Sequence, residues 1–333
     1  MGLKLSILDQ SPISEGITAE EALAETVKLA SHAEKLGYER FWVSEHHDAS
    51  TLAGSSPEVL MAYLAAKTET IRIGSGGVML PHYSSYKVAE NFRMLEGLAP
   101  GRIDAGIGRA PGGMPIASLA LNRGEYRQVD RFSEQVDELL TYLAGDEESG
   151  PYPGLKATPL VQTVPDVWML GSSGSSAMLA AQKGLPYTFA QFINGDGGPD
   201  YMAAYYSSFQ PSCLLSKPKS MAAVFTICAE TDEKAEHLAS SLDLSLLMTA
   251  QGMKSNGVPS PEQAAAYQYS KYERQFIQEN RKRMVVGSPR RVREQYEQIS
   301  EQYKTENIMA VSIMYDFQDK LTSFELLAEA IRT

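Results

Sequence analysis

Two segments of the sequence combine residue types that can bind a phosphate group. The first is the loop Gly171-Ser172-Ser173-Gly174-Ser175-Ser176, which follows the apolar run ending at Leu170 and precedes a predicted helix over residues 177–184. Small residues let backbone N–H groups approach an anion, serine hydroxyls add donors, and a helix N-terminus adds partial positive charge. The same residues would also form a flexible turn capped by Ser176, so this loop alone leaves both interpretations open.

The second segment is Gly106-Ile107-Gly108-Arg109, at the end of an earlier predicted strand. The planar guanidinium of an arginine can donate two parallel hydrogen bonds to a phosphate. If the two strands are neighbours, Arg109 and the serine loop could hold one phosphate between them. The alternative role for Arg109 is an ion pair with a carboxylate.

Two further segments have unusual composition for the ends and interiors of strands. Glu45-His46-His47 follows an apolar run, but adjacent histidines on a strand point to opposite faces, so we predict no metal site. One histidine facing a pocket suits acid–base chemistry, and a buried, hydrogen-bonded histidine is the alternative. Gly76-Gly77 lies inside an apolar strand, where glycine indicates either a β-bulge or a flat ligand against the backbone.

The elements that carry these residues alternate between strands and helices. Eight predicted strands, each followed by a helix, predict a closed (β/α)8 TIM barrel in an α/β protein, with an open doubly wound sheet as the alternative. The predicted strands cover residues 4–8, 40–44, 71–80, 102–107, 166–170, 187–193, 221–229 and 308–314; the helices cover residues 18–36, 57–67, 86–98, 126–143, 177–183, 199–209, 232–248 and 323–331.

In such a barrel the polar residues at the strand ends converge on one mouth. Besides the segments above, these are Asp9, Gln10, Gln191 and Asn194. Active sites of this architecture form at the C-terminal ends of the strands. This convergence supports a functional site more strongly than any single motif.

Two stretches interrupt the regular alternation. Residues 145–165 are rich in glycine, proline and acidic residues and indicate a surface insertion. Residues 251–287 follow strand seven, carry Asn256-Gly257 and two prolines, and end with Arg281, Lys282 and Arg283. We predict that this second insertion is a lid over the mouth, within a single domain spanning residues 1–333; a decorative helix or a dimer contact is the alternative.

Composition excludes several classes of function. The 333 residues carry a formal net charge of −11, which gives no general attraction for nucleic acid or an anionic membrane. Cys213 and Cys228 form no disulfide framework, and no apolar run approaches the ~18 residues of a membrane span. We therefore expect a cytoplasmic protein that binds a small molecule.

Five segments in this order resemble the bacterial-luciferase-like flavin monooxygenases over nearly the whole chain, and the opening Leu8-Asp-Gln-Ser-Pro12 is similar to a subgroup of small luciferase-like oxidoreductases. The segments are Phe41-Trp-Val-Ser-Glu-His-His47, Ile71-Arg-Ile-Gly-Ser-Gly-Gly-Val-Met-Leu-Pro81, Gly101-Arg-Ile-Asp-Ala-Gly-Ile-Gly-Arg109, Gly171–Ser176 with Ala181-Gln-Lys-Gly-Leu-Pro186, and Val286-Gly-Ser-Pro289.

The resemblance implies that a TIM barrel binds reduced FMN at its C-terminal face, with the flavin supplied by a separate flavin reductase. It implies that Arg109, Ser173 and Ser176 hold the phosphate and that the neighbouring Gly108, Leu170, Gly171 and Ser172 also belong to the cofactor-binding site. Gly76-Gly77 would form a non-prolyl cis peptide beneath the isoalloxazine ring, and His46 would be the catalytic histidine. Gly108 replaces a reactive cysteine of the luciferase and Ser172 a glutamate, so we do not expect light emission.

The leading hypothesis is a monooxygenase that uses reduced FMN and O₂ on an unknown organic substrate. The alternatives are an F420-dependent oxidoreductase and a non-catalytic flavin-binding protein on the same barrel. An aldolase-type enzyme is disfavoured because no lysine stands at a predicted strand end to form a Schiff base. We further expect a homodimer, because the predicted helix over residues 57–67 is apolar around its circumference, with Val59, Leu60, Met61, Tyr63 and Leu64.

Overall fold

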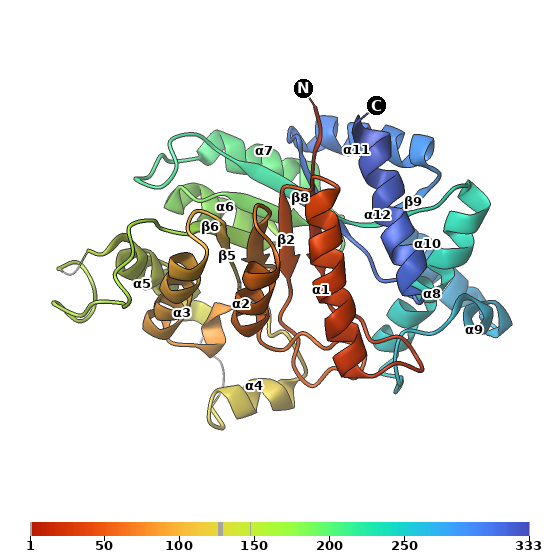
Figure 1. Ribbon diagram of the computed structural model, residues 1–333, viewed down its shortest axis with the longest axis horizontal. Helices are drawn as coiled ribbons and strands as arrows, with labels where there is room; N and C mark the ends of the chain where they lie inside the picture. Colours follow the sequence, from red (N-terminus) through yellow and green to blue (C-terminus); the bar gives the residue numbers. More distant parts are fainter. Residues whose placement is uncertain (1, 126–128, 147, 333) are drawn as a thin grey trace.

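The computed structural model describes residues 2–125, 129–146 and 148–332, which form a closed barrel of parallel strands surrounded by helices (Figure 1). Neighbouring strands follow the order β10-β1-β2-β3-β5-β6-β7-β8, and β8 pairs back to β10 through the register Ile308↔Ala222 to Val311↔Phe225. This last pairing closes the ring of strands. It confirms the predicted barrel and rules out the alternative, an open doubly wound sheet. The eight strands are β1 (Lys4–Asp9), β2 (Arg40–Val43), β3 (Arg72–Ser75), β5 (Ile103–Gly108), β6 (Asp166–Gly171), β7 (Tyr187–Ala190), β8 (Ser220–Cys228) and β10 (Asn307–Val311).

Helices cover the outside of the barrel, and both chain termini lie at the end opposite α4 (Figure 1). A capping box starts the first helix: Thr18 accepts from the Glu21 N–H while the Glu21 carboxylate accepts from the Thr18 N–H. The helices are α1 (Ala19–Lys35), α2 (Pro57–Lys67), α3 (Ser85–Leu98), α4 (Pro115–Leu121), α5 (Phe132–Ala144), α6 (Gly174–Lys183), α7 (Gly198–Ser208), α8 (Asp232–Ala250), α9 (Pro261–Ala266), α10 (Lys271–Arg281), α11 (Pro289–Tyr303) and α12 (Phe317–Arg332).

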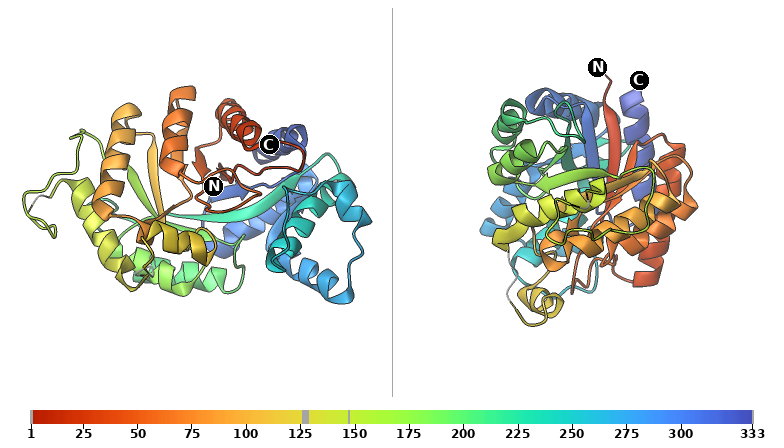
Figure 2. Two further views of the ribbon diagram at one scale, coloured as in Figure 1. Left: turned by 90° about the horizontal axis from the view of Figure 1, so that it is seen from below. Right: turned by 90° about the vertical axis from the view of Figure 1, so that its left-hand side faces the viewer.

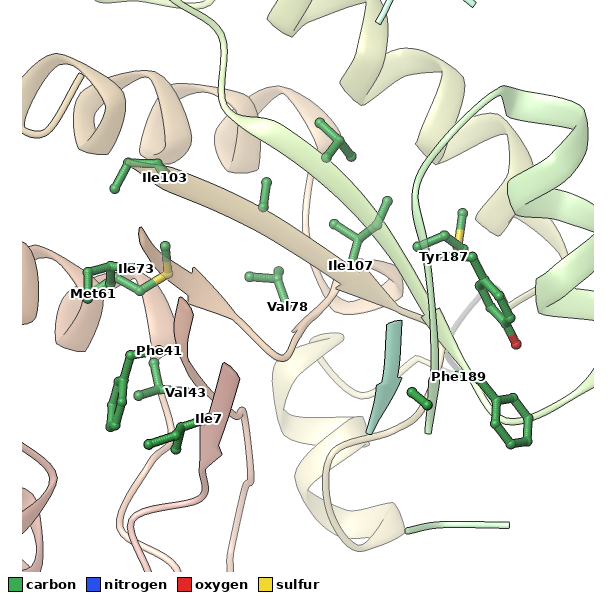
Figure 3. Packing of buried hydrophobic residues seen from close by; sticks show 14 of the residues in the cluster. Ile7, Phe41, Val43, Met61, Ile73, Val78, Ile103, Ile107, Tyr187 and Phe189 are labelled. Carbon is green, nitrogen blue, oxygen red and sulfur yellow. The ribbon is translucent and has the colours of Figure 1, made fainter. Parts of the chain in front are cut away.

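Alternating strand residues divide the apolar core into two layers. Outward residues such as Phe41, Ile73 and Ile107 pack beneath the helices, and Met61 of α2 reaches into this layer (Figure 3). Inward residues such as Trp42 and Trp168 fill the barrel itself. Both sheet faces are therefore buried, which explains why the strands are continuous apolar runs.

Several predicted boundaries differ from the structure by three residues or more: β7 ends at Ala190 rather than residue 193, β10 at Val311 rather than residue 314, and α12 begins at Phe317 rather than residue 323. The predicted strand over residues 71–80 is two strands, β3 and β4 (Val78–Met79), separated by Gly76-Gly77, since glycine has no side chain to pack within a sheet. The predicted helix over residues 126–143 begins at Phe132 after a short 3-10 turn; its predicted start, Tyr126, lies outside the described residues. α6 begins at Gly174 rather than residue 177, with Ser173 as the N-cap.

The insertion over residues 251–287 contains helices α9 and α10 and a strand that the sequence did not predict. β9 (Met284–Gly287) extends the sheet along β8, from Phe225↔Met284 to Cys228↔Gly287. α9 and α10 pack on α8 at the opposite side of the molecule from α5, around a small apolar cluster of their own (Figures 1 and 2). The pattern Met284-Val285-Val286 is too short to be separated from a loop by periodicity.

Four side chains close the N-terminal end of the barrel, which we call the barrel base: the charged Arg40, Arg72 and Asp104, and the neutral Trp42. The Asp104 side chain has no exposed surface and accepts from Arg72 Nη2 at 2.6 Å and from Trp42 Nε1 at 2.9 Å. Arg40 Nε lies 3.2 Å from the same carboxylate. Two guanidinium groups thus share one fully buried carboxylate, and each also pairs with a more exposed acid, Arg40 with Glu39 and Arg72 with Asp166.

Candidate active site

A cavity of about 330 Å³ opens at the C-terminal ends of the strands, which we call the barrel mouth. Its wall contains all nine residues that the sequence predicts to bind a cofactor. These are Gly76, Gly77, Gly108, Arg109, Leu170, Gly171, Ser172, Ser173 and Ser176. The structure brings these residues together from β3–β4, β5 and the β6–α6 loop, and their role in binding stays a prediction.

One end of the cavity is rich in hydrogen-bond donors. Arg109 is exposed, and its Nη2 donates to Ser175 Oγ at 3.3 Å, so the arginine lies beside the serine loop as predicted. Ser175 Oγ lies 3.0 Å from Ser173 Oγ, and Ser173 N-caps α6 without a side-chain capping bond. No carboxylate in the described parts of the chain forms an ion pair with Arg109. The hydroxyls, the guanidinium and the N-terminus of α6 together suit a phosphate dianion.

Gly76 and Gly77 form the adjoining wall, and the peptide bond between them is cis, which confirms that prediction. Neither position has room for a side chain. A Cβ on Gly76 would lie 2.5 Å from Leu8 Cδ1, and a Cβ on Gly77 would lie 2.4 Å from Leu170 Cδ1. The wall is therefore bare backbone, which a planar ring system can approach closely.

Small residues at inward positions hollow out the interior. Barrel interiors are normally filled by branched residues, but Gly76, Gly108, Ala190 and Ala223 line this cavity. The rest of the lining is mostly apolar and was missed by motif reasoning: Leu8, Trp42, Met79, Ala110, Val129, Thr188, Phe192, Ile193 and Met309. The alternation of inward and outward side chains along the strands could have identified the members of this list that lie on strands, such as Leu8, Thr188 and Met309.

His46 lies near the mouth but is not among the residues that line the cavity. Its Nδ1 is 3.0 Å from Ser44 Oγ, and its backbone N–H donates to Gly54 O at 2.8 Å. Burial, and to a lesser degree the neighbouring His47, lowers the pKa of His46 to about 4. His46 is therefore a neutral imidazole at pH 7, and its catalytic role stays a prediction.

Glu45 and His47 form a separate network that the sequence did not predict. The fully buried Glu45 carboxylate accepts from the Met79 backbone N–H at 2.9 Å and from the Tyr83 hydroxyl at 2.8 Å. His47 Nε2 lies 2.7 Å from the same carboxylate, and its backbone N–H donates to Gly112 O at 2.7 Å. Glu45 thus connects the end of β2 to the β4 wall and, through His47, to the loop that follows Arg109.

Of the remaining polar residues at strand ends, Asp9 and Asn194 hydrogen-bond to the scaffold. Asp9 is buried and accepts from Thr26 Oγ1 at 2.6 Å and from the buried Lys320 of α12. Gln10 is likewise buried. Asn194 donates to Ser172 O at 3.4 Å and so supports the serine loop. Gln191 is largely buried, and its Oε1 has no hydrogen-bond partner in the described residues.

The predicted lid contacts the rim of the barrel near both of its ends, since the Arg283 guanidinium donates to the backbone carbonyl of Ile193, which lines the cavity. Val258 donates to Ile13 O at 2.7 Å, and Ser50 Oγ donates to Ser255 O at 2.8 Å, so residues 255–258 lie beside the loops after β1 and β2. Arg281 makes a bidentate ion pair with Asp243, which directs its charge to α8 rather than to the cavity. Closure of the lid stays a prediction.

No helix in the described residues combines the length and apolar character needed to cross a membrane.

Comparison with known proteins identifies the family to which the chain is similar. The family model described as "Luciferase-like monooxygenase" matches residues 3–305. The chain is 56% identical over 329 residues to the uncharacterized protein YwcH of Bacillus subtilis, covering 98% of this chain and 99% of that protein.

Two further matches cover almost the whole chain. The N-acetyl-S-alkylcysteine monooxygenase of Bacillus subtilis is 40% identical over 333 residues, covering 99% of this chain and 98% of that enzyme. The crystal structure of apo-MsnO8 superimposes with a TM-score of 0.90 at 36% identity, covering 99% of this chain and 98% of that one. The similarity therefore includes the barrel and its insertions.

Proposed function

Because the chain belongs to the luciferase-like monooxygenase family, we propose that it is a flavin-dependent monooxygenase that binds reduced FMN in the barrel mouth. The observation that carries this proposal is the convergence of Arg109, the serine loop and the Gly76-Gly77 wall on one cavity. Reduced FMN supplies the electrons with which O₂ is activated. The residues of the cavity bind and orient it and exclude water.

In this proposal the donors at one end of the cavity hold the phosphate. Arg109 contributes positive charge, and the hydroxyls of Ser173, Ser175 and Ser176 contribute neutral donors. Gly76-Gly77 forms the surface against which the ring system lies. The apolar lining, with Trp42 and Phe192, keeps bulk water from the buried part of the ligand.

His46 is the proposed catalytic residue. When the Ser44 hydroxyl donates to Nδ1, the neutral imidazole carries its proton on Nε2. That nitrogen is then a hydrogen-bond donor, and the pKa of about 4 means that the ring is uncharged at pH 7. His46 would donate this hydrogen bond to the reacting centre once the ligand fills the mouth.

An anaerobic titration with reduced FMN, oxidised FMN and reduced F420, followed by mixing with O₂, tests the proposal. We expect reduced FMN to bind more tightly than F420 and oxygen to be transferred to an organic substrate. The first compound to test is the thioether named for the Bacillus subtilis relative, an N-acetyl-S-alkylcysteine. Tight binding of F420 alone would make the protein an F420-dependent oxidoreductase. Flavin that reoxidises as it does free in solution, with no product formed from a panel of thioethers, would indicate a flavin-binding protein.

We also propose that the enzyme works with a separate flavin reductase and forms a homodimer. The α2 and α3 helices lie side by side and expose Val59, Tyr63, Met94 and Leu98, each more than half accessible (Figure 1). Met61 and Leu64 of α2 are buried against the barrel, so this helix is apolar on two sides. Light scattering at micromolar concentration should give twice the mass of one chain.

A further inference from the structure

The inner part of the cavity contains one polar side chain without a partner. Thr188 of β7 is 3% exposed, lines the cavity, and its Oγ1 has no hydrogen-bond partner in the parts of the chain that the structure describes. Other buried threonines are satisfied: Thr26 Oγ1 donates to Asp9, and Thr226 Oγ1 is 2.7 Å from the Tyr296 hydroxyl. The buried hydroxyls of Ser241 and Ser312 also lack a partner in the described residues, but Thr188 is the one of the three that lines the cavity and so requires an explanation.

The strand register places Thr188 between apolar neighbours. It pairs with Leu170 on β6 and with Met221 on β8, neither of which offers a side-chain hydrogen bond. Ala190, two residues further along β7 on the same face, is small and leaves the approach to Thr188 from the mouth open. A hydroxyl buried without a partner costs about 1–3 kcal/mol, and a valine of similar shape would avoid that cost.

Thr188 is also close to the bare backbone wall. Leu170, its partner in the register, lies directly against Gly77, as the 2.4 Å approach of a Cβ built at Gly77 indicates. A ring system that covers Gly76-Gly77 therefore meets Leu170 and then Thr188 as it extends across the cavity. Isoalloxazine has one hydrocarbon edge and one edge with carbonyl and imide groups, and only the second can satisfy a hydroxyl.

We propose that the Thr188 hydroxyl is a positioning residue that hydrogen-bonds to the carbonyl–imide edge of the flavin ring and so directs that edge to β7. This inference rests on the proposed function, because it requires a flavin in the mouth. It assigns the orientation of the ring: the phosphate lies at Arg109, and the polar edge lies at Thr188. The hydrocarbon edge then faces the apolar side of the cavity.

The test compares the wild type with Thr188→Val, which keeps the shape and removes the hydroxyl, and Thr188→Ser, which keeps the hydroxyl. Loss of one neutral hydrogen bond should weaken the binding of reduced FMN about three- to tenfold in Thr188→Val, with most of the affinity kept in Thr188→Ser. Infrared difference spectra with ¹³C-labelled flavin carbonyls report the bond itself. The carbonyl band should move to higher frequency in Thr188→Val and stay near its wild-type position in Thr188→Ser.

Thr226→Val serves as the matched control, because Thr226 is buried on β8 but contacts Tyr296 rather than the cavity. It should leave both the affinity and the carbonyl band unchanged. Wild-type protein that binds no flavin would contradict the proposed function. Wild type and Thr188→Val with equal affinity and identical carbonyl bands would overturn the role of Thr188 and leave the proposed function standing. If Thr188→Val does not fold, Thr188→Ala takes its place with the same readouts.

Discussion

The barrel base and the barrel mouth are built from the same strands in opposite ways. At the base, Asp104 has partners on every side, and Trp42 leaves so little room that a Cβ on Gly74 would lie 2.4 Å from its ring. At the mouth, glycine and alanine leave space, Arg109 contacts only a serine hydroxyl among the described residues, and Thr188 has no partner. The charges of the base are paired without a ligand, whereas among the described residues Arg109 has no counter-charge and Thr188 has no hydrogen-bond partner until something binds.

This contrast predicts that changes at the mouth alter chemistry and binding, while changes at the base alter folding. The division agrees with the general organisation of barrel enzymes, in which one face carries function and the other stability. Each variant is therefore measured for flavin binding or oxygenation and for the free energy of unfolding. An effect on the wrong quantity would contradict the contrast between the two ends.

The largest expected effect is on the rate at the mouth. Replacing His46 by alanine should leave the affinity for reduced FMN nearly intact and slow oxygenation by about 10²–10⁴-fold, the contribution typical of a positioned acid–base group. Rapid mixing of the reduced complex with O₂ measures it. His237→Ala, at an exposed position on α8, is the control and should react as the wild type does. Loss of flavin binding in His46→Ala would instead identify His46 as a structural residue.

The next effect is on stability at the base. Replacing Asp104 by asparagine leaves Arg40 and Arg72 without their buried counter-charge and should lower the free energy of unfolding by about 3–5 kcal/mol. Urea unfolding measures it. Asp137→Asn removes the exposed ion pair with Lys183 and should change the free energy by less than about 1 kcal/mol. Equal effects of the two substitutions would mean that the base does not stabilise the fold through its charges.

A smaller effect is expected on binding at the mouth. Arg109→Ala should weaken reduced FMN binding by about 1.5–3 kcal/mol, the range for hydrogen bonds to a charged group. The free energy of unfolding should stay within about 0.5 kcal/mol of the wild type, because Arg109 is exposed. Arg290→Ala, at an exposed arginine of α11, controls for the loss of one positive charge. Unchanged flavin affinity in folded Arg109→Ala would remove the phosphate assignment.

The last effect appears only on acidification. The pKa of His46 is about 4 in the folded protein and about 6.5 in an unfolded chain, so the unfolded state binds more protons between these values. The contribution of neutral His46 to stability is therefore complete above about pH 6.5 and is lost as the pH falls towards 4. Urea unfolding of the wild type and His46→Asn across pH 4–7 should show the wild type losing more stability on acidification. Parallel curves would contradict the burial of His46.

The sequence predicted the barrel because each strand–helix unit carries its own local signal, such as the apolar run of β1 followed by the capping residues Thr18 and Glu21 of α1. It predicted the cavity wall because Gly76-Gly77, Arg109 and the serine loop are local motifs. The sequence did not predict that Thr188, Ala190 and Ala223 line the cavity, because that depends on which strands are neighbours in the barrel. β9 escaped it because four residues carry too little periodicity.

Charge partners were the least predictable feature. No local sequence pattern shows that Arg281 pairs with Asp243. Nor does any local pattern show that the Glu45 carboxylate is buried in a hydrogen-bond network. Glu45, His46 and His47 are adjacent in the sequence, but in the structure His46 hydrogen-bonds to Ser44 and His47 to Glu45. Adjacent residues at a strand end therefore have separate roles, which only the tertiary contacts reveal.

The crystal structure of the protein with reduced FMN tests the central claim most directly. The account predicts the phosphate within hydrogen-bond distance of the Arg109 guanidinium and the Ser173–Ser176 hydroxyls, and the ring system against Gly76-Gly77 inside the barrel mouth. A flavin bound elsewhere, or one with its phosphate away from Arg109 and the serine loop, would contradict it.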